Sequence, residues 1–409
     1  MTDIDIDIDT ERIRRDFTIL ESGIIYMDTA ATSLTPEPVL DAVLGYYRRY
    51  NANVGRGVHR LTRLATAEYE EARNKVAKFI GARAHEIVFT RNTTEGINMV
   101  ASGLSMHKGD KVVISLLEHH SNLLPWLRAK RKFGIDIEVV KPANGDKRCE
   151  LDISDFEAAI DADTRIVAVS HVSNALGSIL PIREISRLCR ANDALLLVDG
   201  AQSVPHLPVD VKELGCDFMA FSGHKMLAPT GIGALYIREE LMPEIEPLNV
   251  GGGGVETASF VDYKLKAANE GFESGTPDIS GAIGLGAAVD YLNAIGMENV
   301  KRSEEELTKE LIEGLREIPG IEIYGYDTPS DKRIGTVSFN IDGKNPDDVA
   351  LMLDNKAGII VRSGHHCCMP LMNYLGIEGT VRASLYLYNT ESEVNRLLEL
   401  VRTIAASGR

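Results

Sequence analysis

Short β-branched and apolar runs alternate with helix-like stretches over the first two thirds of the chain. Chains with this alternation fold into a mostly parallel sheet that is covered by helices on both faces. In such α/β folds, ligands bind just beyond the carboxyl ends of the strands. The expected strands span residues 87–90, 112–115, 135–140, 166–170, 195–198 and 218–221.

The pattern changes near residue 290, where strands and helices mix in an order typical of a smaller α+β domain. We expect an N-terminal segment over 1–25 that packs on the small domain, a large domain over 26–290, and a C-terminal domain over 291–409. Apolar residues at helical spacing predict helices at 38–50, 65–80, 279–294, 300–318, 346–354 and 391–406. The strands expected in the small domain span 321–324, 336–340, 359–361 and 381–387.

The composition of the 409 residues narrows the function classes. A formal net charge of -16 argues against nucleic acid as the main partner, because phosphate backbones bind basic surfaces. No run of 18 apolar residues occurs, so we expect no membrane helix. The acidic N-terminus does not resemble a secretory signal. Five cysteines, an odd and sparse number, favour a reducing compartment, and we expect a cytoplasmic protein.

An acid and a lysine follow two successive strands of the expected sheet. Asp199 ends the run 195–198, and Lys225 follows the run 218–221 after a turn of small residues. Taken singly, the acid has a simpler interpretation as a helix cap or ion pair, and the lysine as a solvated surface residue. Together they match the needs of pyridoxal phosphate (PLP). Its aldehyde forms an imine with an amine, and its ring nitrogen stays protonated beside a carboxylate.

A phosphate site is expected at the start of the helix that follows the first strand. Asn92 can cap this helix, and Glu95, three residues later, resembles the second half of a capping box. Free backbone N–H groups and the hydroxyl groups of Thr93 and Thr94 can then bind a phosphate. The alternative is a plain helix cap.

Further polar residues stand at the ends of the strands. His119 follows the strand 112–115 and can stack on a pyridine ring and move protons, although a structural histidine is the simpler alternative. Asn174 and Gln202 can donate to the phenolic oxygen of the cofactor. Ser222 and His224 can add phosphate contacts from the lysine turn.

The segment 362–372 reads Arg-Ser-Gly-His-His-Cys-Cys-Met-Pro-Leu-Met and concentrates reactive residues. We favour a nucleophilic thiolate on a mobile loop. Pro370 can open a helix here, and a cysteine before a helix N-terminus and beside histidines has a lowered pKa. Two alternatives are a pair of buried, inert cysteines and a metal site. The metal site is less favoured because neighbouring side chains diverge and no C-x-x-C or H-x-x-x-H spacing is present.

A single arginine, Arg382, lies in one of the expected buried strands. Its planar guanidinium suits a substrate carboxylate that is held through two hydrogen bonds. The structural alternative is an internal salt bridge.

Taken together, these motifs resemble the group II cysteine desulfurases, the SufS and CsdA type, from about residue 14 to the C-terminus. The lysine motif alone indicates only the wider class V aminotransferase group, and the Arg-x-Gly-His-His-Cys loop is the more specific signal. The segments that carry the resemblance are 93–98 (TTEGIN), 118–122 (EHHSN), 171–174 (HVSN), 199–202 (DGAQ), 222–225 (SGHK), 275–277 (GTP), 362–367 (RSGHHC) and 382–384 (RAS).

The resemblance implies a fold type I PLP enzyme that forms a homodimer with shared active sites. It implies that L-cysteine becomes L-alanine while its sulfur passes to Cys367 as a persulfide, and then to an acceptor or iron–sulfur scaffold protein. The resemblance implies that Lys225 forms the Schiff base with the cofactor and, with His119, moves protons. It implies that Asp199 pairs with the ring nitrogen, that Gln202 and Asn174 bond the phenolic oxygen, and that His119 stacks on the ring. It further implies that the phosphate is held by Thr94, Ser222, His224 and, from the neighbouring subunit, Thr276, and that Arg382, with Asn174, binds the substrate.

The chain departs from the family pattern at two positions. Gly55-Arg56 stands where the family commonly has His-Arg, and Cys368 stands where a small residue without sulfur is more usual. Cys368 either packs or carries sulfur. The competing functions are another PLP enzyme of this fold, such as a selenocysteine lyase, an aminotransferase or a kynureninase-like lyase, and a non-catalytic scaffold that binds metal through His365, His366, Cys367 and Cys368.

Overall fold

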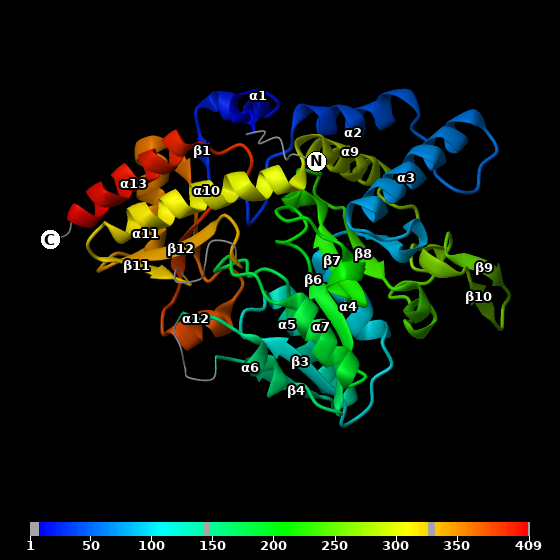
Figure 1. The fold of residues 1–409 in the computed structure, drawn as a ribbon. Helices are drawn as coiled ribbons and strands as arrows, with labels where there is room; N and C mark the ends of the chain where they lie inside the picture. Colours follow the sequence, from blue (N-terminus) through cyan, green and yellow to red (C-terminus); the bar gives the residue numbers. More distant parts are fainter. Residues whose placement is uncertain (1–7, 143–147, 326–331, 408–409) are drawn as a thin grey trace, which may run out of the picture.

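A seven-stranded sheet forms the centre of the protein (Figure 1). The computed structural model describes residues 8–142, 148–325 and 332–407. The strand order is β2-β8-β7-β6-β5-β3-β4, and β8 runs antiparallel to both neighbours while the other adjacent strands pair in parallel. The strands are β2 (Ile87–Thr90), β3 (Lys111–Ser115), β4 (Asp136–Val140), β5 (Thr164–Ser170), β6 (Leu195–Asp199), β7 (Phe218–Ser222) and β8 (Gly233–Ile237).

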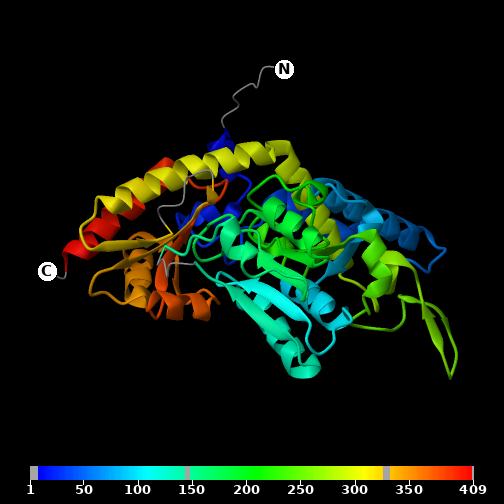
Figure 2. The ribbon, with the colours of Figure 1, turned by 60° about the horizontal axis from the view of Figure 1, so that its bottom comes forward.

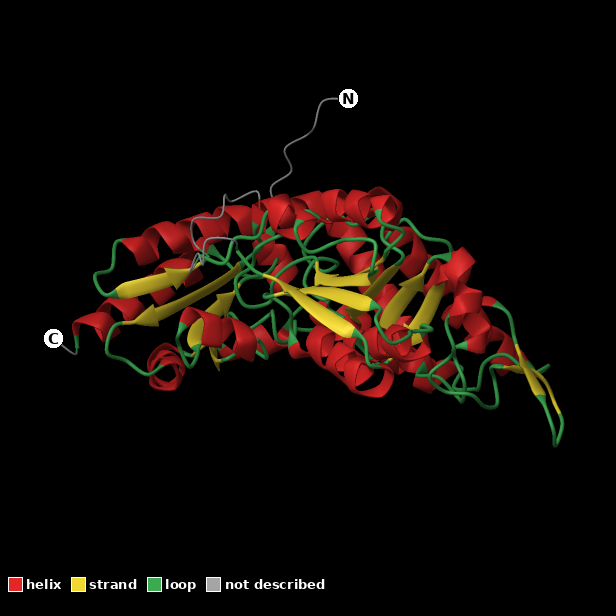
Figure 3. Ribbon diagram, turned by 90° about the horizontal axis from the view of Figure 1, so that it is seen from below, coloured by secondary structure: helices red, strands yellow, loops and turns green. Residues whose placement is uncertain are grey.

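The central sheet separates two hydrophobic layers, because successive side chains on a strand point to opposite faces. On β6, Leu196 and Val198 pack into one layer, and Leu195 and Leu197 pack into the other. Helices lie on both sides of the strands (Figure 3), which confirms the expected α/β fold. The first layer includes α2 (Glu37–Arg49), α3 (Arg60–Phe79), α7 (Ile182–Ala191) and α9 (Ile279–Ile295), and the second includes α4 (Thr93–Gly103) and α5 (His120–Phe133).

A smaller antiparallel sheet, in the order β11-β12-β15-β14, forms after α9 (Figure 2, orange and red). Its side chains share a separate core with α10, α11 and α13, as expected for an α+β part. Met27 joins this core, because β1 pairs with β13. The exact limits of the three expected parts remain predictions. The elements are β1 (Ile25–Tyr26), α10 (Met297–Arg316), β11 (Ile321–Tyr324), β12 (Thr336–Ile341), α11 (Pro346–Ala357), β13 (Ile359–Ile360), β14 (Arg362–Gly364), α12 (Met369–Leu375), β15 (Thr380–Ser384) and α13 (Glu391–Ala406).

The structure departs from the expected elements in several places, which include the unexpected short strands β1 and β14. β8 was not expected, because it returns antiparallel without the intervening helix on which the strand–helix rule depends. The strand expected over 381–387 ends at Ser384, because the chain turns where Asn389 N–H donates to the carbonyl of Tyr386. The exposed hairpin of β9 (Val255–Ala258) and β10 (Tyr263–Leu265) projects from the body (Figure 2) and lacks the apolar alternation of a buried strand. Short helices α1 (Thr10–Arg14), α6 (Ile153–Glu157) and α8 (Val211–Leu214) complete the described α-helices.

No single helix within the described ranges has both the length and the apolar composition to cross a bilayer. Only α9 and α10 pass that test jointly, across a bend of 73°.

Candidate active site

A cavity of about 450 Å³ lies beyond the carboxyl ends of β5, β6 and β7 and is also bordered by the loop that carries the paired cysteines. All but one of the expected site residues line it. Thr276 instead lines a second cavity of about 540 Å³, together with Gly55 and Arg56. The expected residues that line the first cavity are Thr93, Thr94, His119, Asn174, Asp199, Gln202, Ser222, His224, Lys225, Cys367 and Arg382.

Lys225 and Asp199 reach this cavity from adjacent parallel strands. Burial lowers the pKa of the Lys225 amine, against the opposing attraction of Asp199. Burial raises the pKa of the Asp199 carboxyl, which accepts a hydrogen bond from Ala201 N–H at 2.9 Å. A lowered pKa keeps more of a lysine in its neutral, nucleophilic form. Lys225 can therefore supply an imine-forming amine, and Asp199 can supply a carboxylate that the Ala201 N–H and the charge of Lys225 stabilise against the effect of burial.

The N-terminus of α4 faces the same cavity. Asn92 Oδ1 accepts the N–H of Glu95 at 3.0 Å, which confirms Asn92 as the helix cap. The capping box is wrong in its second half, because the Glu95 carboxylate accepts the N–H of Arg91 at 2.5 Å instead of returning to Asn92. The start of a helix presents free N–H groups and a partial positive charge, so this end can hold an anion.

Hydroxyl groups surround this helix start. Ser222 Oγ lies 2.7 Å from Thr93 Oγ1 and accepts the Thr93 N–H at 2.8 Å, while Thr94 Oγ1 lies 2.7 Å from Ser121 Oγ. Burial lowers the pKa of nearby His224 to about 4, so its ring is neutral near pH 7. The site therefore offers neutral hydrogen-bonding groups, with Lys225 as the adjacent basic side chain.

His119 caps α5 and lines the cavity. Its Nδ1 accepts the N–H of Ser121 at 3.0 Å, so the neutral ring carries its proton on Nε2. Burial, followed by the positive charge of Lys225, lowers the pKa of His119 to about 3. A neutral, flat ring of this kind can stack on an aromatic ligand and exchange a proton at Nε2.

Sequence analysis missed the role of Glu118, which precedes His119. Its fully buried carboxylate accepts hydrogen bonds from Ser115 Oγ (2.5 Å), Asn122 Nδ2 (2.6 Å) and Ser170 Oγ (2.7 Å). Burial raises the pKa of Glu118 to about 7 in spite of these donors. The carboxylate ties the end of β3 to the end of β5 and thereby fixes the chain at His119. The available signal was an acid three residues after the end of a buried strand.

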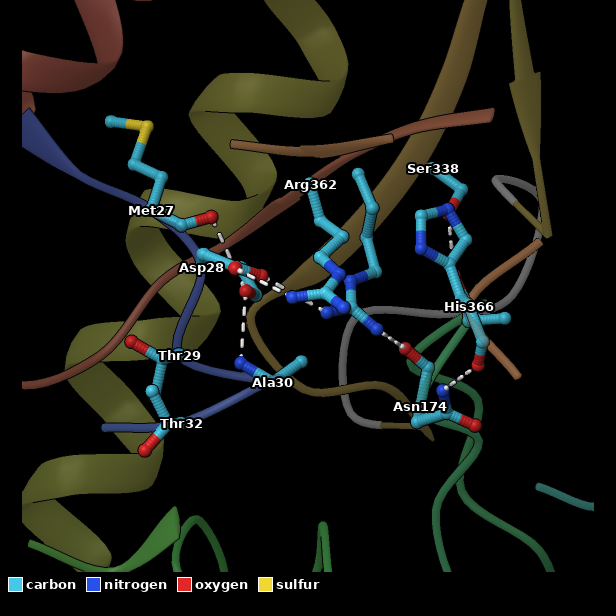
Figure 4. Close-up of polar contacts among 12 residues, drawn as sticks. Met27, Asp28, Thr29, Ala30, Thr32, Asn174, Ser338, Arg362 and His366 are labelled. Carbon is cyan, nitrogen blue, oxygen red and sulfur yellow. Dashed lines mark hydrogen bonds and ion pairs between the residues drawn. The ribbon is translucent and has the colours of Figure 1, made fainter. Parts of the chain in front are cut away.

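The amide groups of Asn174 and Gln202 are partly engaged by the protein itself. Gln202 Nε2 donates to the carbonyl of Ala30 at 2.8 Å, and its buried Oε1 has no hydrogen-bond partner among the described residues. Asn174 Nδ2 donates to the carbonyl of His366 at 2.8 Å (Figure 4). Asn174 Oδ1 accepts from Cys368 Sγ at 3.1 Å. The contact of Asn174 with the cysteine loop had no local signal in the sequence.

Arg382 forms the internal salt bridge that was its structural alternative. Its Nη2 donates to Asp28 Oδ1 at 3.1 Å and its Nη1 donates to the carbonyl of Asn174 at 2.9 Å. Arg362 also approaches Asp28, at 3.6 Å (Figure 4). The buried Nε of Arg382 has no partner among the described residues, so one donor is free for a ligand. No sequence signal pointed to Asp28.

The two cysteines of the loop have different environments. Cys367 is half-buried and lines the cavity, whereas Cys368 is fully buried. Helix α12 begins directly after Cys368 and has Pro370 in its first turn, as expected. No group of three or more His, Cys, Asp or Glu side chains in the described part of the chain could hold a metal ion.

Comparisons with known proteins agree with this geometry. The family model for class-V aminotransferases matches residues 25–397. The chain is 48% identical to a probable cysteine desulfurase of Pyrococcus abyssi, over 97% of this chain and 99% of that protein. The solved cysteine desulfurase of Thermococcus onnurineus superposes with a TM-score of 0.94 at 47% identity, covering 98% of this chain and 99% of that one. For the cysteine desulfurase CsdA of Escherichia coli, the TM-score is 0.89 at 34% identity, and 98% of each chain is covered.

These likenesses extend over nearly the whole chain and confirm the fold type I architecture. The family match implies pyridoxal phosphate as cofactor. The chain belongs to the class-V aminotransferase family and, within it, to the cysteine desulfurases.

Proposed function

We propose that this protein is a PLP-dependent cysteine desulfurase that moves the sulfur of L-cysteine onto Cys367 and releases L-alanine. The observation that carries the proposal is one cavity lined by a lysine, a buried acid and a half-buried cysteine: Lys225, Asp199 and Cys367. Lys225 and Asp199 have the chemistry that binds the cofactor, and Cys367 has the chemistry of a group that accepts sulfur.

The side chains of the cavity fit PLP chemically. Lys225 would attach the cofactor and Asp199 would pair with its ring nitrogen, and the unpartnered Oε1 of Gln202 marks a buried polar position that a ligand can satisfy. When bound, PLP supplies an electron sink for negative charge at the α-carbon of the substrate. The start of α4 would hold the phosphate together with Thr93, Thr94, Ser222 and His224, and Thr276 of a second subunit would join them.

Each remaining step is assigned to a side chain of this protein. Arg382 binds the substrate carboxylate through its free Nε, with help from Asn174. Lys225 and Nε2 of the neutral His119 move protons at the substrate. Cys367 attacks the substrate sulfur, so that the carbon–sulfur bond breaks as a sulfur–sulfur bond forms. L-cysteine and the Cys367 thiol then become L-alanine and a Cys367 persulfide, which balances all atoms.

The persulfide passes to a sulfur acceptor or an iron–sulfur scaffold protein. We propose a cytoplasmic homodimer with shared active sites, in which the second cavity, with Thr276 and Arg56, faces the partner's first cavity. We divide the chain into an N-terminal segment over 1–25, a large domain over 26–290 and a small C-terminal domain over 291–409.

A cysteine substitution tests the proposal directly. Cys367→Ser should reduce alanine and sulfide release from L-cysteine by about 10²-fold or more while the visible absorbance of bound cofactor is unchanged. Cys189→Ser, at a buried cysteine on α7, is the matched control and should keep full turnover. Full turnover by Cys367→Ser would exclude the thiol mechanism.

A further inference from the structure

The backbone of the cysteine loop is strained beside the nucleophile. His366 has φ 50° and Cys367 has φ 56°, two consecutive non-glycine residues in the left-handed region. This conformation is unfavourable for a residue with a side chain, so it persists only where surrounding contacts hold it. The loop therefore depends on its anchors.

The amide of Asn174 is one of those anchors, and it holds the loop on both sides of Cys367. Its Nδ2 donates to the carbonyl of His366 at 2.8 Å, a contact that Figure 4 shows. Its Oδ1 accepts the thiol of Cys368 at 3.1 Å. Because an amide has one donor end and one acceptor end, the Cys368 thiol also sets which way the Asn174 amide faces.

The environment of Cys368 favours a protonated thiol that donates a hydrogen bond over a thiolate that acts as a nucleophile. The side chain is fully buried. Burial, followed by the nearby Glu118 carboxylate, raises the pKa of the Cys368 thiol to about 12, so the proton stays on sulfur. A thiol that stays protonated donates a hydrogen bond and reacts slowly with electrophiles and persulfides.

We propose that Cys368 is a positioning residue, whose thiol orients the Asn174 amide and so holds Cys367 in its strained position at the cavity. This inference rests on the proposed function of Cys367, but it concerns only how the loop is held. Cys368 thus has a role distinct from carrying sulfur and from filling space. The departure from the usual small residue at this position adds an anchor to the loop.

The test is the rate at which iodoacetamide alkylates Cys367 in the cofactor-loaded protein, resolved from the other cysteines by peptide mass spectrometry. In Cys368→Ala the Asn174 Oδ1 contact is lost, and the rate should rise about threefold, a factor at the low end for one hydrogen bond because a thiol is a weak donor. Cys368→Ser keeps a donor and should return the rate to within about twofold of the unchanged protein. Cys368→Val fills the volume of the thiol but cannot donate a hydrogen bond, so its alkylation rate should match that of the alanine variant. It replaces the alanine variant in this test if that variant folds poorly.

A buried cysteine outside the site provides the control. Cys216 donates to the carbonyl of Val211, at 3.8 Å, and Cys216→Ala should leave the Cys367 alkylation rate unchanged. An unchanged rate in the alanine and valine variants, or a serine variant that matches them, would overturn the proposal. So would a persulfide found on Cys368 after turnover. If L-cysteine gives no persulfide at all, the proposed function fails, while the alkylation comparison still decides the role of Cys368.

Discussion

Arg382 donates from Nη2 to Asp28 Oδ1 at 3.1 Å, although the two residues are 354 positions apart in the sequence. Arg382 lies on β15 of the small sheet. Asp28 lies two residues after β1, the first strand of the described chain. The pair therefore connects the N-terminal chain to the small sheet beside the substrate site. It also neutralises the buried guanidinium of Arg382.

Removing the charge of Asp28 should destabilise the protein. Asp28→Asn leaves the guanidinium of Arg382, only 3% exposed, without its counterion. Breaking a buried ion pair in this way typically costs about 3 kcal/mol in the free energy of unfolding. Urea unfolding measures the change. Asp290→Asn breaks the exposed pair with Lys75 and should change stability by no more than about 0.5 kcal/mol, so equal effects would contradict the assignment.

Lys225 should be the point of covalent attachment for the cofactor. Borohydride reduction of the loaded protein should add the mass of the reduced cofactor to the peptide that contains Lys225. Lys225→Arg should prevent this mass gain and lower turnover by about 10³-fold, because arginine can neither form the bond nor exchange the proton. Lys212→Arg, on an exposed turn of α8, should behave as the unchanged protein. A mass gain elsewhere would refute the assignment.

Buried His171 should make the protein less stable in mild acid. Burial lowers its pKa from 6.5 to about 4, so between these values the unfolded chain binds more protons than the folded one. Stability from this group is therefore lost as pH falls from 6.5 toward 4. Between pH 7.5 and 5.5, the unchanged protein should lose about 1 kcal/mol more than His171→Gln. His107→Gln, at an exposed position, should retain the original dependence, and a His171→Gln curve of the same shape would contradict the prediction.

His206 and Glu304 should be energetically coupled. His206 Nδ1 lies 2.7 Å from Glu304 Oε1, both side chains are 2% exposed, and the pair joins the turn that begins at Asp199 to α10. Double-mutant cycles with His206→Ala and Glu304→Ala should give a coupling energy of about 2 kcal/mol. The exposed pair of His85 and Glu239, at 3.2 Å, should give less than about 0.5 kcal/mol. A coupling near zero for the buried pair would show that it does not anchor the turn.

Most strands of the central sheet and most residues that line the cavity were predictable from local patterns. All six strands expected in the large sheet are present, each starting or ending within two residues of its prediction. Asp199 and Lys225 meet because adjacent parallel strands must bring their carboxyl ends to one edge of the sheet. The cap at Asn92 and the helix start at Pro370 were predictable because capping and proline geometry act over only a few residues.

The sequence by itself thus determined six of the seven strands of the central sheet, the lysine–acid pair and the cysteine loop, whose signals are periodic or local. The tertiary structure alone decided that Asn174 holds both neighbours of Cys367, that Arg382 pairs with Asp28, and that Thr276 lies in a different cavity. These contacts join segments that approach only when the two sheets pack together. Single side chains that meet across such distances leave no spacing or periodicity in the chain, so only the folded arrangement reveals them.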